Sequence, residues 1–204
     1  HKESNRIPIK KGVRQGDTIS PLLFTACLQE VFRSVEWEQL EIRVNGEYLS
    51  NLRFADDIGL LSNSGDKLQL MITELDKENR KVGLKIILQK TKVMYNYLRR
   101  EQHFEIGNSA LQVVKDYVYL GQVITVEPNH ETEVTRRIRI GWSTFGKHSR
   151  IMTGRLPLSL KIYNSCILPI LSYGAEIWRL TKKVQLKLRT TQRAMERKMV
   201  GVTL

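Results

Sequence analysis

Hydrophobic positions in the first half of the chain recur at helical spacing in two places. The first predicted helix follows the segment RQGDTIS, where Ser20 can cap a helix that has Pro21 at its first position. The second predicted helix begins near Asp66 and ends at Gly83. The apolar stripe of the first helix is Leu23, Cys27, Val31 and Val35, and that of the second is Leu68, Met71, Ile72, Leu75 and Val82.

Between these helices the pattern changes to the short alternating runs of strands. Residues 42–62, IRVNGEYLSNLRFADDIGLLS, predict several short strands. One turn is expected at Asn45–Gly46 and another at the adjacent acids Asp56 and Asp57. These two acids interrupt apolar runs that would otherwise read as a single buried strand.

The rest of the chain is expected to be extended first and helical afterwards. Residues 84–90 read as extended, and residues 104–125 alternate as a hairpin that turns near Gly107–Asn108. After Pro128 the pattern is helical, and the shift of composition there predicts a domain boundary. The apolar stripes of this region are Val134, Ile138, Phe145 and Met152 in its first part and Val184, Leu188, Met195 and Met199 in its last helix.

Length and composition indicate an intracellular protein of one large domain or two small ones. A chain of 204 residues can bury a core without disulfides or a structural metal. Its two cysteines, Cys27 and Cys166, form no CxxC pair, which indicates a reduced compartment, nucleus or cytoplasm, and no zinc site. Its richest apolar stretch, residues 167–178, is far short of the ~20 residues that a membrane span needs. Since the sequence starts with His1 and stops after a helical pattern, we expect it to be part of a longer protein.

The positive charge is concentrated in the last third of the chain. The net charge is +12, yet residues 1–131 hold 18 basic and 18 acidic side chains, and residues 132–204 hold 15 and 3. Arg136, Arg137 and Arg139 cluster in the first helical stretch. Arg189, Arg193 and Arg197 recur at four-residue spacing in the last one and share one face. Such a surface is typical of proteins that bind nucleic-acid phosphates, and the alternative is an ordinary solvated helix face.

The paired acids allow two interpretations. Asp56 and Asp57 could shape a turn, because Asp bonds to nearby backbone and tolerates turn geometry. They could instead hold a hard cation such as Mg²⁺, which takes one or two carboxylates together with substrate phosphate oxygens.

Several segments resemble the reverse transcriptases of non-long-terminal-repeat (LINE-type) retrotransposons. KKGVRQGDTISPLLF at 10–24 resembles the family's GxRQGDxxSPxLF segment, and FADD at 54–57 resembles its [FY]ADD hairpin. Two further segments, GLKIILQKTKVM at 83–94 and YVYLGQVI at 117–124, resemble the next block and the primer grip. Three later segments, RRIRIGWSTF, KIYNSCILPILSYGAEIW and QRAMERKMVG, resemble the thumb and post-thumb region. The order of the blocks also matches the family.

The resemblance implies a fold and an activity. It implies an α+β fold with a polymerase palm-like antiparallel sheet and packed helices over residues 1–126, followed by a basic helical thumb and post-thumb region over residues 127–204. The implied activity is RNA-directed DNA synthesis onto a primer 3′-hydroxyl, with an RNA template, a DNA primer, deoxynucleotide triphosphates and Mg²⁺ or Mn²⁺ as partners. No membrane partner is expected.

The resemblance also implies roles for single residues. Asp56 is the main metal ligand, Asp57 is a weaker ligand or a hairpin-shaping acid, and Lys90 is the candidate general acid for the departing pyrophosphate. The residues implied to bind template and nucleotide are Arg14, Gln15, Gly16, Phe54 and Ala55, and those implied to hold the primer are Tyr119, Leu120 and Gly121. Alternatives remain: Gly16–Asp17 as a turn and helix cap, Lys90 as surface charge, and Tyr119 and Leu120 as core residues.

One family feature has no match in this sequence. The family places another metal-binding aspartate on an earlier strand, some dozens of residues before the RQGD segment, whereas Glu3 is the only acid before Asp17 here. We therefore expect the chain by itself to lack a complete metal site and to be inactive. Two alternatives stay open: a catalytically incomplete nucleic-acid-binding module and a repurposed protein-interaction domain.

Overall fold

The chain folds into two compact units. The computed structural model describes residues 12–37, 40–96, 102–127 and 129–202. The units meet in sequence between Lys115 and Asp116. This division precedes the predicted boundary between residues 126 and 127, because residues 116–125 form a hairpin that is bonded to the first helix of the second unit. Pro128, which suggested the later boundary, lies outside the described residues.

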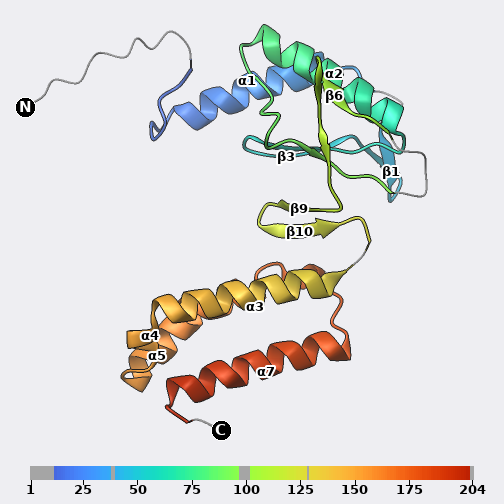
Figure 1. Cartoon of the computed structure of the whole chain (residues 1–204). Helices are drawn as coiled ribbons and strands as arrows, with labels where there is room; N and C mark the ends of the chain where they lie inside the picture. The colour runs from blue at the N-terminus through green and yellow to red at the C-terminus, as the bar shows by residue number, and fades with distance from the viewer. Residues whose placement is uncertain (1–11, 38–39, 97–101, 128, 203–204) are drawn as a thin grey trace, which may run out of the picture. The chain divides into compact units, whose positions relative to one another are not determined.

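The first unit combines two long helices with short strands. Helix α1 (Ser20–Ser34) packs against helix α2 (Gly65–Lys81), as Figure 1 shows. The strands are β1 (Ile42–Val44), β2 (Glu47–Leu49), β3 (Asn51–Phe54), β4 (Asp57–Leu60), β5 (Lys92–Val93), β6 (Glu105–Ile106), β7 (Ser109–Ala110) and β8 (Gln112–Val113).

The strands pair two by two. In the described residues β1–β2, β3–β4 and β6–β7 are antiparallel hairpins, and β5 pairs with β8 in parallel. The α+β composition expected from the sequence is confirmed. The single palm-like antiparallel sheet is not observed, because each described strand has only two to four residues and one partner.

The helices of the first unit bury faces that differ in part from the prediction. Leu28 and Val31 of α1 are buried, whereas Leu23 and Cys27, both assigned to the apolar stripe, are exposed. Val31, Trp37, Met71 and Leu75 form one core cluster, and Ile72, Val93, Phe104, Ile106 and Leu111 form another. The predicted stripe is therefore confirmed at Val31 and Val35 and wrong at Leu23 and Cys27, since Leu28 is buried in place of Cys27.

The ends of these helices also refine the prediction. Ser20 is the first residue of α1 rather than its cap, and Ile19 occupies the cap position. Val82 follows the last residue of α2 and is 40% exposed, so it does not belong to the buried stripe. Gly83 has a φ of +81°, the left-handed conformation that ends helices, which confirms its predicted role.

The segments between residues 84 and 125 are less regular than predicted. Residues 84–90 form a loop and a turn rather than a strand, and the strand begins later, at Lys92. The predicted single hairpin over 104–125 is two hairpins. The first turns at Gly107–Asn108 as expected, and the second, in the other unit, joins β9 (Asp116–Tyr119) to β10 (Gln122–Thr125).

The second unit is helical apart from this hairpin. Helix α3 (His130–Lys147) begins after Asn129, whose side chain accepts a hydrogen bond from the N–H of Glu131 at 3.2 Å. Helix α7 (Lys182–Met199) lies beside α3 and is capped by Thr181. Between them lie α4 (Ser149–Met152), α5 (Leu156–Ile162), the π-helical turn η1 (Tyr163–Ile167), α6 (Leu168–Ser172) and the 3₁₀ turn η2 (Ala175–Ile177).

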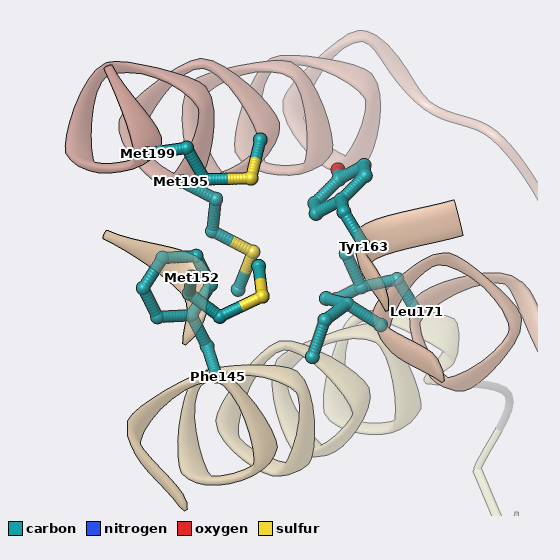
Figure 2. Packing of buried hydrophobic residues seen from close by; sticks show 7 residues of the cluster. Phe145, Met152, Tyr163, Leu171, Met195 and Met199 are labelled. Carbon is teal, nitrogen blue, oxygen red and sulfur yellow. The ribbon is translucent and has the colours of Figure 1, made fainter. Parts of the chain in front are cut away.

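The core of the second unit uses the apolar stripes that the sequence predicts. Figure 2 shows Phe145 and Met152 facing Met195 and Met199 of α7, with Tyr163 and Leu171 completing the cluster. A second cluster contains Val134, Trp178 and Val184. Gly141 lets α3 approach α6 closely, because a Cβ atom there would lie 2.7 Å from a methyl carbon of Leu171.

Candidate metal and nucleic-acid sites

The paired acids lie at the tip of the β3–β4 hairpin. Phe54 pairs with Asp57, so the loop between the strands consists of Ala55 and Asp56 alone. Ala55 has a φ of +54°, because a two-residue hairpin loop needs left-handed backbone at its first position. Residues 54 to 57 are all exposed, and the Phe54 side chain is 65% exposed. Asp56 therefore lies in a tight turn, Asp57 begins β4 directly after it, and both side chains are displayed to solvent.

The two carboxylates at this tip are open to a ligand. Among the described residues neither Asp56 nor Asp57 forms an ion pair or a side-chain hydrogen bond, and no group of three or more acidic, cysteine or histidine ligands is present. Two exposed carboxylates fit the way proteins hold Mg²⁺, with water and substrate phosphates filling the remaining positions. They do not form a complete metal cage within the part of the chain that the structure describes.

The hairpin is anchored to α1 through Arg53. Its guanidinium donates a hydrogen bond to Gln29 Oε1 at 3.2 Å and stacks 4.4 Å from the ring centre of Phe32. Arg53 directly precedes the tip residue Phe54. The orientation of the acidic tip is thus linked to the carboxyl-terminal half of α1.

The RQGD segment forms the turn that leads into α1. The N–H of Asp17 donates to the Arg14 carbonyl at 3.3 Å, Asp17 Oδ1 accepts from the N–H of Ile19 at 3.1 Å, and Ser20 Oγ donates to the Arg14 carbonyl at 2.6 Å. Gly16 has a φ of +91°, and no atom lies within 4 Å of the position a Cβ would take. Asp17 and Ser20 build the turn and leave the backbone at Gly16 open.

The structure does not bring the RQGD turn and the acidic tip into direct contact. Arg14, Gln15 and Gly16 are exposed at the start of α1, and Gln29, to which the hairpin is anchored, lies about 14 Å further along the helix at 1.5 Å per residue. Among residues 12–37 and 40–96, no hydrogen bond or ion pair joins Arg14, Gln15 or Gly16 to either acid. Lys90 is exposed and lies in a turn. Its backbone N–H donates a hydrogen bond to the Ile87 carbonyl at 3.0 Å.

The predicted primer-binding residues lie at the tip of the β9–β10 hairpin. Tyr119 pairs with Gln122, so Leu120 and Gly121 form the two-residue loop, with φ angles of +47° and +76°. Tyr119 is half-buried, and Leu120 is 38% exposed. This tip belongs to the helical unit, in contrast to the acidic tip.

The predicted nucleic-acid-binding arginines fall into two groups. Arg139, Arg189 and Arg193 are exposed, and Arg197 is half-buried. Arg136 and Arg137 instead bond within the unit, to the carboxylate of Glu133, with Nε–O distances of 2.8 and 2.5 Å. Arg137 is 7% exposed, so its guanidinium is not available to a phosphate while these bonds are made.

Three acidic or aromatic residues were missed by the sequence analysis. Glu131 and Glu133 stand at the start of α3, and Tyr173 precedes the left-handed Gly174. Glu133 precedes Arg136 and Arg137 at three- and four-residue spacing, a signal of helix ion pairs that the sequence contained. No local pattern relates Tyr173 to the hairpin, because the two are far apart in sequence.

The buried and paired carboxylates have low pKa values. Burial raises the pKa of Glu133, but hydrogen bonds from Arg136 and Arg137 outweigh it, and the pKa lies below its ordinary value. Hydrogen bonds from Lys183 and Lys187 of α7 lower the pKa of Glu131 to about 2. Both acids are therefore ionised at neutral pH.

Within the described residues, no helix has both the length and the apolar composition required to traverse a bilayer.

Comparison with known proteins identifies relatives of the first unit and beyond. Residues 1–125 match the sequence profile of the family described as "Reverse transcriptase (RNA-dependent DNA polymerase)". A putative uncharacterized transposon-derived protein of Caenorhabditis elegans is 36% identical over 169 residues, which cover 80% of this chain and 61% of that protein. The retrovirus-related Pol polyprotein from type-1 retrotransposable element R2 of Nasonia vitripennis is 29% identical over 125 residues, or 55% of this chain and 12% of the polyprotein. The chain thus spans less than two thirds of the length of either relative.

Proposed function

This chain belongs to the reverse transcriptase (RNA-dependent DNA polymerase) family, and we propose that it takes part in RNA-templated DNA synthesis in a non-long-terminal-repeat retrotransposon protein. The observation that supports this best is the acidic tip of β3–β4, where two exposed carboxylates without partners among the described residues stand within the family match. The names of the two relatives, both derived from transposable elements, support the proposed origin.

The proposed roles follow the geometry of the first unit. Asp56 and Asp57 hold Mg²⁺ or Mn²⁺, which when bound supplies the charge that activates the primer 3′-hydroxyl and stabilises the leaving oxygen. The exposed ring of Phe54 and the left-handed Ala55 limit how closely the primer end approaches these carboxylates. Arg14, Gln15 and the open backbone at Gly16 contact template and nucleotide, and Lys90 supplies a proton to pyrophosphate.

The helical unit is proposed to hold the template–primer duplex. Tyr119, Leu120 and Gly121 contact the primer strand near its 3′ end. The exposed Arg139, Arg189 and Arg193, together with the half-buried Arg197, contact phosphates without reading sequence. Arg136 and Arg137 are not assigned to phosphates, because Nε and Nη2 of each guanidinium bond to Glu133 and Gly121 within the unit.

The metal site is proposed to be incomplete within these 204 residues. Glu3, the only acid before Asp17, falls outside the described residues and outside the matched RQGD segment. A further metal-binding carboxylate, beside Asp56 and Asp57, would then have to come from a polypeptide longer than this chain. On this proposal the 204-residue chain binds template–primer and does not extend it.

Primer extension tests the proposal. The 204-residue chain and the longest reading frame that contains it are each incubated with Mg²⁺, deoxynucleotide triphosphates and a DNA primer on an RNA template. We expect extension by the longer protein and none above background by the chain alone. Robust extension by the chain alone would contradict the incomplete site, and no extension by either would contradict polymerase function.

A nucleic-acid-binding module without catalysis is the second candidate. The observation that favours it is the excess of 15 basic over 3 acidic side chains in residues 132–204, in a unit that holds its own core. This candidate predicts duplex binding by both proteins and extension by neither.

A further inference from the structure

Both carbonyl groups at the tip of the β9–β10 hairpin are bound by side chains from other parts of the helical unit. The Gly121 carbonyl accepts a hydrogen bond from Arg136 Nη2 at 2.5 Å and another from Arg137 Nη2. The Leu120 carbonyl accepts a hydrogen bond from Tyr173 Oη at 2.8 Å. These three side chains together with Glu133 are called the tip clamp below.

Glu133 is the centre of the tip clamp. It is 2% exposed, and its carboxylate accepts hydrogen bonds from Arg136 and Arg137. It also accepts a hydrogen bond from the N–H of Val123, the second residue of strand β10, at 3.1 Å. One buried carboxylate thus orients the two guanidinium groups that bind the tip and binds the strand directly.

The ring of Tyr173 packs directly on the tip. The Arg137 guanidinium lies 4.3 Å above the ring centre, and a Cβ atom on Gly121 would lie 3.5 Å from the ring. The next residue, Gly174, approaches Gln122 so closely that a Cβ there would lie 2.3 Å from the Gln122 side-chain oxygen. Residues from α3 and from the loop after α6 therefore contact the tip, although Leu120 and Tyr173 remain partly exposed.

The tip conformation needs such support. Leu120 adopts the left-handed region with a φ of +47°, which costs free energy for any residue with a Cβ atom. Strained backbone of this kind persists where its surroundings determine it, and it is common at ligand-contacting sites.

We propose that the tip clamp fixes the β9–β10 tip to the helical unit in the conformation that receives the 3′ end of a primer strand. Glu133, Arg137 and Tyr173 are positioning residues that act through the tip and do not touch nucleic acid. The inference rests on the proposed function for the primer, whereas the clamp itself can be tested without nucleic acid.

Hydrogen–deuterium exchange of the 204-residue chain tests the clamp. Tyr173→Phe removes one hydrogen bond and keeps the ring. We expect it to speed amide exchange in residues 118–123 by about three- to tenfold, the factor for one lost hydrogen bond. Tyr48→Phe, which removes an exposed hydroxyl from β2 in the other unit, is the matched control and should leave these rates unchanged. Unchanged rates in Tyr173→Phe would overturn the clamp.

Glu133→Gln gives a stronger perturbation of the same network. It should speed exchange at Val123 more than Tyr173→Phe does, because it alters three hydrogen-bonding partners at once. Exchange in α7 reports whether the unit remains folded. If Glu133→Gln unfolds the unit, Tyr173→Phe alone decides the question.

Binding to two RNA–DNA duplexes tests the positioning role. One duplex has a recessed primer 3′ end on an RNA overhang, and the other is blunt. We expect the wild-type chain to prefer the recessed end, and Tyr173→Phe to lose at least about half of that preference while the salt dependence of binding stays the same, because no phosphate contact is removed.

The outcomes separate the two claims. A wild-type chain with no preference for a recessed end would contradict the proposed primer contact, whatever the exchange data show. A preference that persists in full in Tyr173→Phe, although tip exchange has accelerated, would overturn the positioning role and leave the proposed function intact.

Discussion

Each unit has one hairpin tip with predicted site residues, and the two tips are built alike and supported differently. Each has a two-residue loop whose first residue is not glycine and is left-handed, Ala55 in one and Leu120 in the other. At β3–β4 no described side chain binds the two acids. At β9–β10 both loop carbonyls are bound by Arg and Tyr side chains.

The difference fits two functions, the binding of exchangeable ligands at one tip and the positioning of a strand at the other. Carboxylates that take up metal ions and phosphates must be free to exchange ligands, so satisfying them internally would compete with binding. A tip that sets the position of a strand gains from rigidity, and a buried carboxylate with two arginines supplies it. Changes at the first tip should therefore affect chemistry, and changes at the second should affect stability and positioning.

The largest expected effect is at the acidic tip. In a polymerase-competent protein that contains this chain, Asp56→Asn should lower the rate of nucleotide addition by more than about a hundredfold, because a metal ligand is worth several kcal/mol to the transition state. The unfolding midpoint should stay nearly the same, since the side chain is exposed. Single-turnover extension and thermal unfolding measure the two effects. A retained rate, or an unfolded protein, would favour the turn-shaping role of Asp56.

At the tip clamp we expect a substitution to lower the stability of the helical unit, which the change at the acidic tip should leave nearly the same. Glu133→Gln leaves the buried Arg137 without its counter-charge, and we expect a loss of about 3 kcal/mol in the free energy of unfolding of the helical unit. Urea denaturation of the 204-residue chain measures it. Glu176→Gln, an exposed acid of η2, is the matched control. Equal small losses in the two variants would show that the network adds little to stability.

A smaller effect, on the salt dependence of duplex binding, distinguishes exposed arginines from those that bond within the unit. Arg189→Gln should reduce the salt slope of duplex binding by about 0.9, the value for one phosphate contact. Arg137→Gln should not change that slope, because its guanidinium is bound internally. Changing Arg189, Arg193 and Arg197 together should reduce it by roughly three if all three reach phosphates. A salt titration with a labelled RNA–DNA duplex measures the slopes, and identical slopes for all proteins would assign the stripe to a solvated face.

The smallest effect concerns the pairing of α3 with α7. The pKa of Glu131 is lowered to about 2 by Lys183 and Lys187, below its value in the unfolded chain. The resulting stabilisation is fully present above about pH 4.5 and is lost as the pH falls toward 2. Glu131→Gln should therefore lower the urea midpoint at pH 6 and have less effect at pH 3. A difference between the proteins that does not change with pH would exclude this ion pair as its cause.

Local sequence patterns predicted turns, helix ends and most apolar stripes better than they predicted which helix faces pack together. The NG and DD turns, the stop at Gly83 and the apolar stripes of α3 and α7 depend on neighbours within a few residues, and the structure confirms them. The first half of the α1 stripe was wrong, because adjacent apolar residues, Leu22 to Phe24, leave the helix phase ambiguous there.

For the candidate sites too, the sequence predicted local features and missed contacts between residues that are distant in the chain. The acidic tip could be predicted, because FADD between apolar runs is a local signal. The internal use of Arg136 and Arg137 could not, because it depends on Gly121 and Tyr173, which approach only in the folded unit. A count of arginines on a helix face does not reveal which guanidinium groups are already bound.

Paramagnetic broadening by Mn²⁺ tests the central claim, that the β3–β4 tip is an open metal-binding site. The chain is labelled with ¹⁵N and titrated with Mn²⁺ in the presence of a deoxynucleotide triphosphate. We predict that amide signals of residues 54–57 broaden first and that Asp56→Asn removes this effect. Broadening that begins elsewhere, or that survives in Asp56→Asn, would contradict the assignment of the metal to this tip.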